Sequence, residues 1–293
     1  MTMFCYRAYG LTISSALEIP EFSPGNGGAP SVTIRIGPVA EAIDTHSPAR
    51  GYCRAAPDRF LLNIPDVARF LVMEGHEVVV EREGPESRIR PFLVGSLFGV
   101  LLRQRGILPL HGSAVATPRG AAIFAGPRGQ GKSTLAAEFW RRGYRVLADD
   151  ICAVTPGPLG LAQAWPGYPS LNLHPDAVEQ VEACAGLLDP AGEEGQKRRL
   201  ILRRFSQDSV PVATVYSLRH APECGQPRLT PLKGFAKLEE IAANTHGRRV
   251  PVNGQYLEQV RALAAQARVV RVERPQALSR LGELADRLEE DFA

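Results

Sequence analysis

Apolar positions divide the chain into a strand-rich first part and a second part in which strands and helices alternate. Up to residue 88, short β-branched or aromatic runs are separated by segments rich in turn-forming residues, at 6–13, 31–36, 59–64 and 77–82. Residues 89–105 are then almost wholly apolar and predict a buried helix. We therefore expect a small β-rich N-terminal domain over residues 1–88 and a second domain over residues 89–293.

The second domain has the alternating pattern of an α/β fold. Strands are predicted at 108–115, 121–125, 144–148, 210–218 and 268–272. Helices are predicted at 133–142, 176–185, 232–244, 255–267 and 275–290. The proline- and glycine-rich stretch 155–175 predicts irregular structure, and 189–196 predicts a polar loop. The first two strands are expected to form a hairpin that turns at Pro118-Arg119.

A glycine-rich segment between a predicted strand and a predicted helix carries the most specific chemistry. Residues 126–134 have the spacing G-x-x-x-x-G-K-[ST], which in this context predicts a phosphate-binding loop. Backbone N–H groups would surround nucleotide phosphates, Lys132 would reach the β- and γ-phosphates, and Ser133 would ligate Mg²⁺. The helix would add its positive N-terminal end. The expected ATP-binding residues are Gly126, Pro127, Arg128, Gly129, Gln130, Gly131, Lys132, Ser133 and Thr134.

Composition narrows the alternatives. The 34 basic and 31 acidic residues give a net charge of +3 and are dispersed, which argues against a nucleic-acid-binding surface. No apolar run approaches the roughly 20 residues of a membrane helix, and the first residues lack a signal peptide's features. We therefore expect a cytoplasmic protein without a membrane partner. The five cysteines form no C-x-x-C pair and are expected to be reduced. Whether the chain forms a homo-oligomer is left open.

Two further features are expected to lie near the phosphates. Counting outward from the hairpin turn pairs His111 with Gly126, although a slip of one residue would make His111 an ordinary strand-end histidine. The predicted strand 144–148 ends in Asp149-Asp150. A right-handed crossover would make it parallel to the strand before the glycine loop. One aspartate could then hold Mg²⁺ and the other accept a proton from an incoming hydroxyl, or the pair could simply end the strand.

These segments together resemble the catalytic domain of HPr kinase/phosphorylase and its relatives. The resemblance covers about 45 residues, from Leu108 to Ala153, with His111-Gly112, the glycine loop and the R-G-x-R-x-x-A-D-D run of residues 142–150. It implies that Asp150 accepts the proton of a substrate serine, that Ser133 holds Mg²⁺, and that His111 supports the site, which leaves Asp149 as the second candidate ligand of Mg²⁺. Lys132 would contact the phosphates.

One departure separates this chain from the bifunctional enzymes of that family. They carry a glycine-rich segment with a magnesium-binding glutamate after the Asp-Asp strand, and residues 165–176 here contain no glutamate. The segment is more similar to the branch that phosphorylates the C-terminal serine of lasso-peptide precursors. That branch shares the aromatic-Arg-x-aromatic-Gly-Leu start, here Tyr6 to Leu11, and a Lys-Arg-Arg-Leu run, here Lys197 to Leu200.

Two basic residues of that run are the remaining candidates. Lys197 and Arg198 would stabilise the transferring phosphoryl group or bind an acidic peptide terminus, unless they form only a solvated charge run. His174-Pro175-Asp176 is interpreted as a helix start, with a catalytic role as the alternative. The resulting hypothesis is an ATP- and Mg²⁺-dependent serine kinase acting on a peptide or small protein. The alternatives are a bifunctional HPr kinase/phosphorylase and a nucleotide-dependent regulator or scaffold without phosphotransfer.

Overall fold

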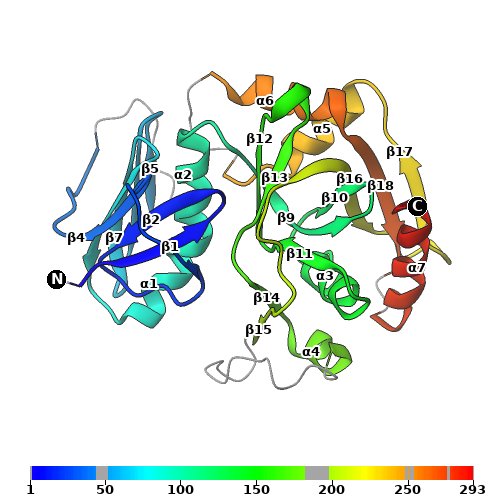
Figure 1. Ribbon diagram of the computed structural model, residues 1–293, viewed down its shortest axis with the longest axis horizontal. Helices are drawn as coiled ribbons and strands as arrows, with labels where there is room; N and C mark the ends of the chain where they lie inside the picture. Colours follow the sequence, from blue (N-terminus) through cyan, green and yellow to red (C-terminus); the bar gives the residue numbers. More distant parts are fainter. Residues whose placement is uncertain are drawn as a thin grey trace. The chain divides into compact units, whose positions relative to one another are not determined.

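The computed structural model of the chain contains two compact units (Figure 1). Unit 1 comprises residues 1–109 and 245–259, and unit 2 comprises residues 110–244 and 260–293. The structure describes residues 2–43, 52–181, 198–247, 250, 254–275 and 278–292. The division at residue 109 differs from the predicted division after residue 88. None of the helices within these described ranges has the length and hydropathy needed to span a bilayer.

Unit 1 is built on one eight-stranded mixed sheet, with strand order β3-β1-β2-β4-β8-β7-β6-β5. The three central strands β2, β4 and β8 are parallel, and the other pairs are antiparallel. The strands are β1 (Phe4–Ala8), β2 (Leu11–Ser15), β3 (Ser23–Pro24), β4 (Val32–Ile36), β5 (Cys53–Ala55), β6 (Arg59–Ile64), β7 (Ala68–Met73) and β8 (Glu77–Arg82).

The apolar segment that follows this sheet belongs to unit 1. It forms α1 (Glu86–Phe92), the π-helical turn η1 (Leu93–Leu97) and α2 (Phe98–Gln104). The ring of Phe98 lies 5.0 Å from that of Phe22 and 5.9 Å from that of Tyr9. His246 packs so closely on α2 that a Cβ at Gly99 would lie 2.2 Å from its ring. These contacts explain why the helical segment and residues 245–259 join the N-terminal sheet.

The first predicted strand, residues 6–13, is a hairpin rather than one strand. Tyr9 and Gly10 occupy the turn between β1 and β2, with φ of 56° and 75°. Positive φ at both central positions is the geometry of a tight hairpin turn, where Asn-Gly is usual. The turn was not predicted because its first position is occupied by Tyr9, an aromatic residue that is more typical of strands. Strands β3, β5 and β7 were also not predicted.

Unit 2 contains a second mixed sheet, with strand order β10-β9-β12-β13-β16-β18-β17, in which β10 also pairs with β16 and β11 pairs with β9. A separate pair is formed by β14 and β15. The strands are β9 (Leu108–Thr117), β10 (Gly120–Ala125), β11 (Arg145–Ala148), β12 (Ile151–Thr155), β13 (Gln163–Trp165), β14 (Ser170–Leu173), β15 (Arg198–Ile201), β16 (Val210–His220), β17 (Arg228–Pro231) and β18 (Arg268–Arg274). The α/β class predicted for this part of the chain is confirmed.

Strands β10, β11, β16 and β18 of this sheet run in the same direction. Both β10 and β11 are antiparallel to β9, on its opposite sides, while β16 is parallel to β10 and β18 is parallel to β16. The predicted direction of β11 is therefore confirmed. The hairpin register is also confirmed from Thr117↔Gly120 to Gly112↔Ala125. Because parallel strands end at the same edge, the residues that follow β10, β11, β16 and β18 gather there.

Helices pack against this sheet. The helical segments described in unit 2 are α3 (Lys132–Arg141), η2 (Pro158–Gly160), α4 (Pro175–Val181), α5 (Phe235–Ala243), α6 (Tyr256–Gln266), η4 (Leu278–Arg280) and α7 (Leu281–Phe292). Of these, α6 begins within unit 1. Figure 1 shows α3 and α7 side by side. Their rings meet in the core, since Phe139 lies 5.4 Å from Phe124 and 5.1 Å from Phe292. The segment 155–175 is more regular than predicted, because it contains β13 and β14. The predicted loop 189–196 lies outside the described residues.

An ion-pair cluster links α3 to α7. Arg142, just after α3, donates to Glu138 at 2.7 Å, to Asp286 at 2.7 Å, and to Glu289 at 2.5 Å. Glu138 is nearly buried and also accepts from Arg141. Burial alone would raise the pKa of Glu138, but the hydrogen bonds from Arg141 and Arg142 lower it. The stabilisation is therefore complete at neutral pH and is lost as the pH falls through that lowered pKa.

We predict that Arg142→Met lowers the free energy of unfolding by about 2–4 kcal/mol, because Arg142 is mostly buried and joins Glu138 of α3 to Asp286 and Glu289 of α7. Arg141→Met is the matched control, since Arg141 is about half exposed and its loss should cost less than about 1 kcal/mol. Urea titration of both variants at pH 7 measures the difference. Equal losses for the two variants would contradict this account of the α3–α7 contact.

Candidate functional site

A glycine-rich loop connects β10 to α3 at the edge where the parallel strands end. Gly126, Gly129 and Gly131 have φ of 147°, 86° and 74°, a region that residues with a Cβ rarely adopt. The Lys132 Nζ donates to the carbonyls of Gly126 and Pro127, both at 2.9 Å, and thereby closes the loop. The loop thus has the conformation that directs successive N–H groups towards an anion at the start of a helix.

Asp149, which follows β11, is a buried carboxylate with three hydrogen-bond donors. Its Oδ1 accepts from Ser133 Oγ at 2.7 Å and from Ser113 Oγ at 2.6 Å. Its Oδ2 accepts from the Asn172 N–H at 2.9 Å. Burial raises the pKa of Asp149, and these hydrogen bonds oppose the rise. Asp149 therefore connects the first turn of α3 to strands β9 and β14.

The side chain of Asp150 points in a different direction from that of Asp149. It adopts a φ of 67°, a left-handed conformation that aspartate tolerates better than most residues. Its Oδ1 lies 3.3 Å from His111 Nδ1, which also lies 3.2 Å from the Asp150 carbonyl. The side chain is 41% exposed, so Asp150 is open to an incoming molecule whereas Asp149 is not. The prediction that the two carboxylates point in different directions is confirmed.

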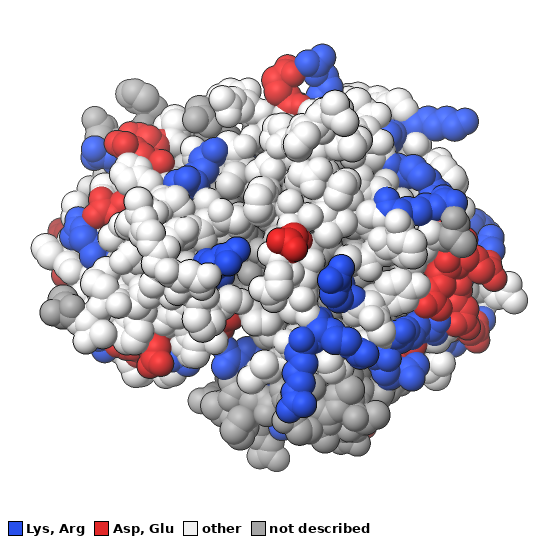
Figure 2. Space-filling view, viewed as in Figure 1, with Lys and Arg blue, Asp and Glu red and all other residues white. Residues whose placement is uncertain are grey.

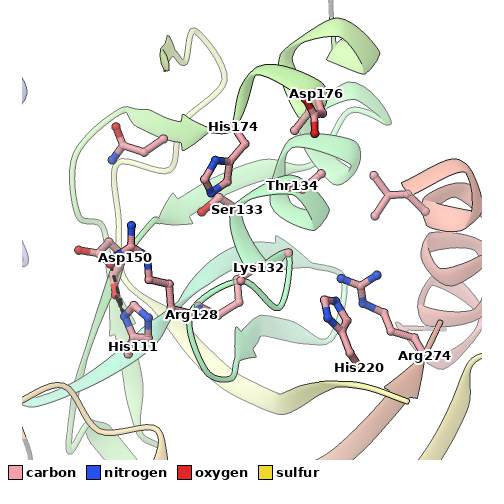
Figure 3. Close-up of a pocket in the computed structure, with 15 residues that line it drawn as sticks. His111, Arg128, Lys132, Ser133, Thr134, Asp150, His174, Asp176, His220 and Arg274 are labelled. Carbon is pink, nitrogen blue, oxygen red and sulfur yellow. Dashed lines mark hydrogen bonds and ion pairs between the residues drawn. The ribbon is translucent and has the colours of Figure 1, made fainter. Parts of the chain in front are cut away.

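These residues border a cavity of about 550 Å³ within unit 2, shown in Figure 3. Its wall includes the predicted residues His111, Arg128, Gly129, Gly131, Lys132, Ser133, Thr134 and Asp150. Gly126, Pro127 and Gln130 belong to the same loop, and Asp149 is buried behind Ser133. The predicted site residues between 111 and 150 therefore come together at one place.

Of the two basic candidates, Arg198 is among the described residues. Lys197 lies outside the described residues. Arg198 is paired with the buried Leu173, whereas the next residue, Arg199, is paired with Asn172, which lines the cavity. Side chains of paired residues share a face of the sheet, and neighbours along a strand alternate. Arg199 is thus on the cavity side of the β14–β15 pair. The proposed role of Lys197 and Arg198 stays a prediction.

Several cavity residues were not selected from the sequence as site residues. They are Asn172, Asp176, Ala177, His174, His220, Arg274 and Leu281. His174 and Asp176 flank the first residue of α4, so the predicted helix start is confirmed and both side chains also face the cavity. His220 and Arg274 are the last residues of β16 and β18. Both residues end strands that are parallel to β10, and this position is the feature of the sequence from which they could have been predicted as site residues.

The donor set suits a magnesium ion bound together with phosphates. Within the described ranges, no group of three or more His, Cys, Asp and Glu side chains is arranged to hold a metal by itself. Mg²⁺ in nucleotide sites usually takes only one or two protein ligands, with phosphate and water oxygens completing its shell. The hydroxyl of Ser133 and the carboxylate of Asp149, already 2.7 Å apart, fit that arrangement.

Comparisons with known proteins give a partial likeness to solved structures. No protein-family model and no curated protein matches the sequence. Among solved structures, the HPr(Ser) kinase/phosphatase from Coxiella burnetii is similar to this chain. The similarity covers 62% of the present chain and 95% of the Coxiella chain, with 9% sequence identity and a TM-score of 0.35. At so low a TM-score the likeness supports no conclusion about activity, and function has to be inferred from the cavity's own residues.

The glycine loop gives a direct test of the cavity's geometry. A Cβ at Gly126 would lie 2.7 Å from the Leu218 carbonyl oxygen, whereas one at Gly129 would meet nothing within 4 Å. We predict that Gly129→Ala costs about 1–2 kcal/mol for its left-handed backbone alone. Gly126→Ala should cost at least about 3 kcal/mol, because strain and collision combine. Urea unfolding of the two variants measures this difference, and equal costs would show that the loop is not packed on β16 in this way.

Proposed function

We propose that the protein is an ATP- and Mg²⁺-dependent serine kinase that phosphorylates a peptide or small protein. The observation that carries this proposal is the divergence of two adjacent carboxylates beside the glycine loop. Asp149 is bonded to Ser133, the expected metal ligand, and Asp150 is open to the cavity beside His111. An exposed carboxylate at this position can accept the proton of an acceptor hydroxyl, which is the role of the catalytic base in kinases.

The phosphate-binding residues are those of the loop and the start of α3. Backbone N–H groups and Lys132 would hold the phosphates, and the helix would contribute its positive end. Ser133 and Asp149 would hold Mg²⁺, which when bound neutralises charge on the β- and γ-phosphates. Ser113 and the Asn172 N–H keep the Asp149 carboxylate oriented, so its position does not depend on the nucleotide. Such preorganisation is the main contribution a protein makes to phosphoryl transfer.

Asp150 would act as the general base. The serine oxygen of the acceptor attacks the γ-phosphorus, the bond between that phosphorus and the bridging oxygen of ADP breaks, and the serine proton passes to Asp150. His111 orients this carboxylate through Nδ1. The left-handed backbone at residue 150 keeps the carboxylate apart from Asp149, so one aspartate can serve the metal while the other serves the acceptor.

The acceptor is proposed to be a peptide whose serine lies at the C-terminus, as in a lasso-peptide precursor. Figure 2, seen from the same side as Figure 1, shows basic side chains gathering over the part of unit 2 that contains α3, β14 and β15. Arg199 lies in β15, and the exposed Arg203 and Arg204 follow this strand. Guanidinium groups bind carboxylates well. A terminal carboxylate next to the reacting serine would therefore be attracted to this surface.

We predict that Asp150→Asn binds ATP with wild-type affinity but transfers phosphate about 10²–10⁴-fold more slowly, because only the proton acceptor is removed. Asp208→Asn, which changes an exposed aspartate away from the cavity, is the control and should remain fully active. Calorimetric titration with ATP and a phosphotransfer assay measure the two quantities. An Asp150→Asn variant with wild-type transfer would rule out this mechanism. A protein that lacks transfer altogether but changes a partner's binding with ATP would instead be a regulator.

Lys132→Ala should weaken ATP binding about 10- to 100-fold and abolish transfer, because Lys132 is expected to contact the β- and γ-phosphates directly. Its loss also removes two hydrogen bonds that close the loop. The comparison with Asp150→Asn therefore separates a binding defect from a chemical one. Undiminished phosphorylation by Lys132→Ala would contradict the assignment of the nucleotide site.

A peptide ending in serine with a free carboxylate should be phosphorylated at least about tenfold more efficiently than the same peptide with a C-terminal amide, since only the acid is attracted to the basic surface. A peptide ending in alanine controls for the phosphorylated position. The ratio of kcat/KM for the acid and the amide measures the preference. A ratio near one would leave the kinase activity in place but exclude recognition of the terminal carboxylate.

A further inference from the structure

Arg274 is a buried cation at the edge of the glycine loop. It ends β18, is 7% exposed, and lines the cavity. Its Nη2 donates to the Gln130 carbonyl at 2.7 Å and its Nη1 to the Pro275 carbonyl at 3.3 Å, while its Nε has no hydrogen-bond partner. Among the residues that the structure describes, no carboxylate forms an ion pair with it. The guanidinium is thus held in place but not neutralised.

Such an arrangement is costly unless an anion completes it. Burial lowers the pKa of Arg274, yet a guanidinium stays charged in proteins. An unpaired buried charge is strongly unfavourable, and arginine is the residue best suited to hold phosphate in a partly dry site. The two carbonyl contacts fix the direction of the guanidinium towards the loop. Arg274 therefore has the properties of a preformed phosphate contact.

His220 is the neighbour of Arg274 across the sheet. The two residues are paired in the register of β16 and β18. The His220 N–H donates to Gln130 Oε1 at 2.6 Å, so Gln130 connects both strand ends to the glycine loop. The Nε2 atom of the His220 ring is buried and has no hydrogen-bond partner. Burial and the charge of Arg274 lower the pKa of His220, so its ring is neutral at pH 7. His220 can therefore form a hydrogen bond with an uncharged group beside the phosphate.

The position of this pair indicates which part of a nucleotide it would meet. In the order β11, β9, β10, β16, β18, the aspartates and the Arg274–His220 pair lie on opposite sides of the glycine loop. Figure 3 shows the same arrangement, with Asp150 and His111 on one side of Lys132 and with His220 and Arg274 on the other. In loops of this type the lysine and the metal contact the β- and γ-phosphates, and the loop amides also reach the α-phosphate.

We propose that Arg274 binds the α-phosphate of the donor and that His220 contacts its nucleoside, so that this side of the cavity selects a nucleotide over inorganic pyrophosphate. The inference rests on the proposed kinase function, since it takes the reacting γ-phosphate to lie on the side of Asp150. The donor would then extend across the loop, from the aspartates to the ends of β16 and β18. The nucleoside end of the donor would be bound by residues that take no part in the transfer step.

Binding measurements on Arg274→Gln test the assignment. In the presence of Mg²⁺, its dissociation constants for ATP and ADP should rise by the same factor, roughly 10- to 100-fold. The constant for pyrophosphate should change less than about threefold, because pyrophosphate can occupy the β- and γ-positions beside Lys132 and leave the α-position empty. At saturating ATP, kcat and the KM for an acceptor peptide should stay within about threefold of wild type. Equal weakening of ATP and pyrophosphate, or a rise confined to the peptide KM, would overturn the proposal.

Two further variants control for charge and for folding. Arg119→Gln removes an arginine from the exposed turn before β10 and should bind ATP as the wild type does. Arg274→Lys keeps the charge but not the two-pronged guanidinium, and serves if Arg274→Gln does not fold. It should bind ATP several-fold more weakly with pyrophosphate unchanged. Failure of the wild type to bind ATP would contradict the proposed kinase function. Wild-type ATP affinity in a folded Arg274 variant would contradict only the nucleoside-end assignment.

Discussion

The arrangement of the cavity depends on the buried carboxylate of Asp149. A buried carboxylate is tolerated only where donors surround it, and here the donors come from three different segments of the chain. Ser133 belongs to α3, Ser113 to β9, and Asn172 to β14. Satisfying one charge thus fixes the distance from the glycine loop to strands β9 and β14. It also leaves a carboxylate oxygen beside the hydroxyl that is expected to hold a metal.

Because Asp149 is held in the interior, the neighbouring Asp150 is the acid that can face the cavity. Since Asp149 is turned inward, a neighbouring acid can reach the cavity only if its side chain points in another direction. Asp150 does so, with a positive φ at the junction between β11 and β12. His111 is one residue beyond the last pair of the β9–β10 hairpin, and this register brings it to the Asp150 carboxylate. A strained residue that is held by its neighbours in this way is common at functional sites.

Much of this arrangement could be predicted because it depends on local rules. The turn at residues 118–119 sets the hairpin register, and a crossover of ordinary handedness sets the direction of β11. Together these place His111, the glycine loop and both aspartates at one edge. Ser113 could not be selected in the same way, because nothing along an apolar strand distinguishes a serine that meets a carboxylate from any other buried serine.

The remaining differences have equally specific causes. Tyr9 occupies a left-handed turn position where the sequence showed only a strand-forming aromatic residue. The predicted strands 210–218 and 268–272 end two residues before His220 and Arg274, so both residues were left out of the site. Residues 245–259 pack on unit 1 through contacts such as His246 on Gly99, which only the tertiary structure reveals.

The central claim is that Asp150 receives an acceptor's proton while the γ-phosphate leaves ATP. The most direct measurement follows the label of γ-labelled ATP when the wild-type protein, Mg²⁺ and a seryl peptide are mixed. The account predicts that the label appears as phosphoserine, with one ADP formed for each peptide modified. Label that appears only as inorganic phosphate, or remains in ATP although ATP is bound, would contradict it.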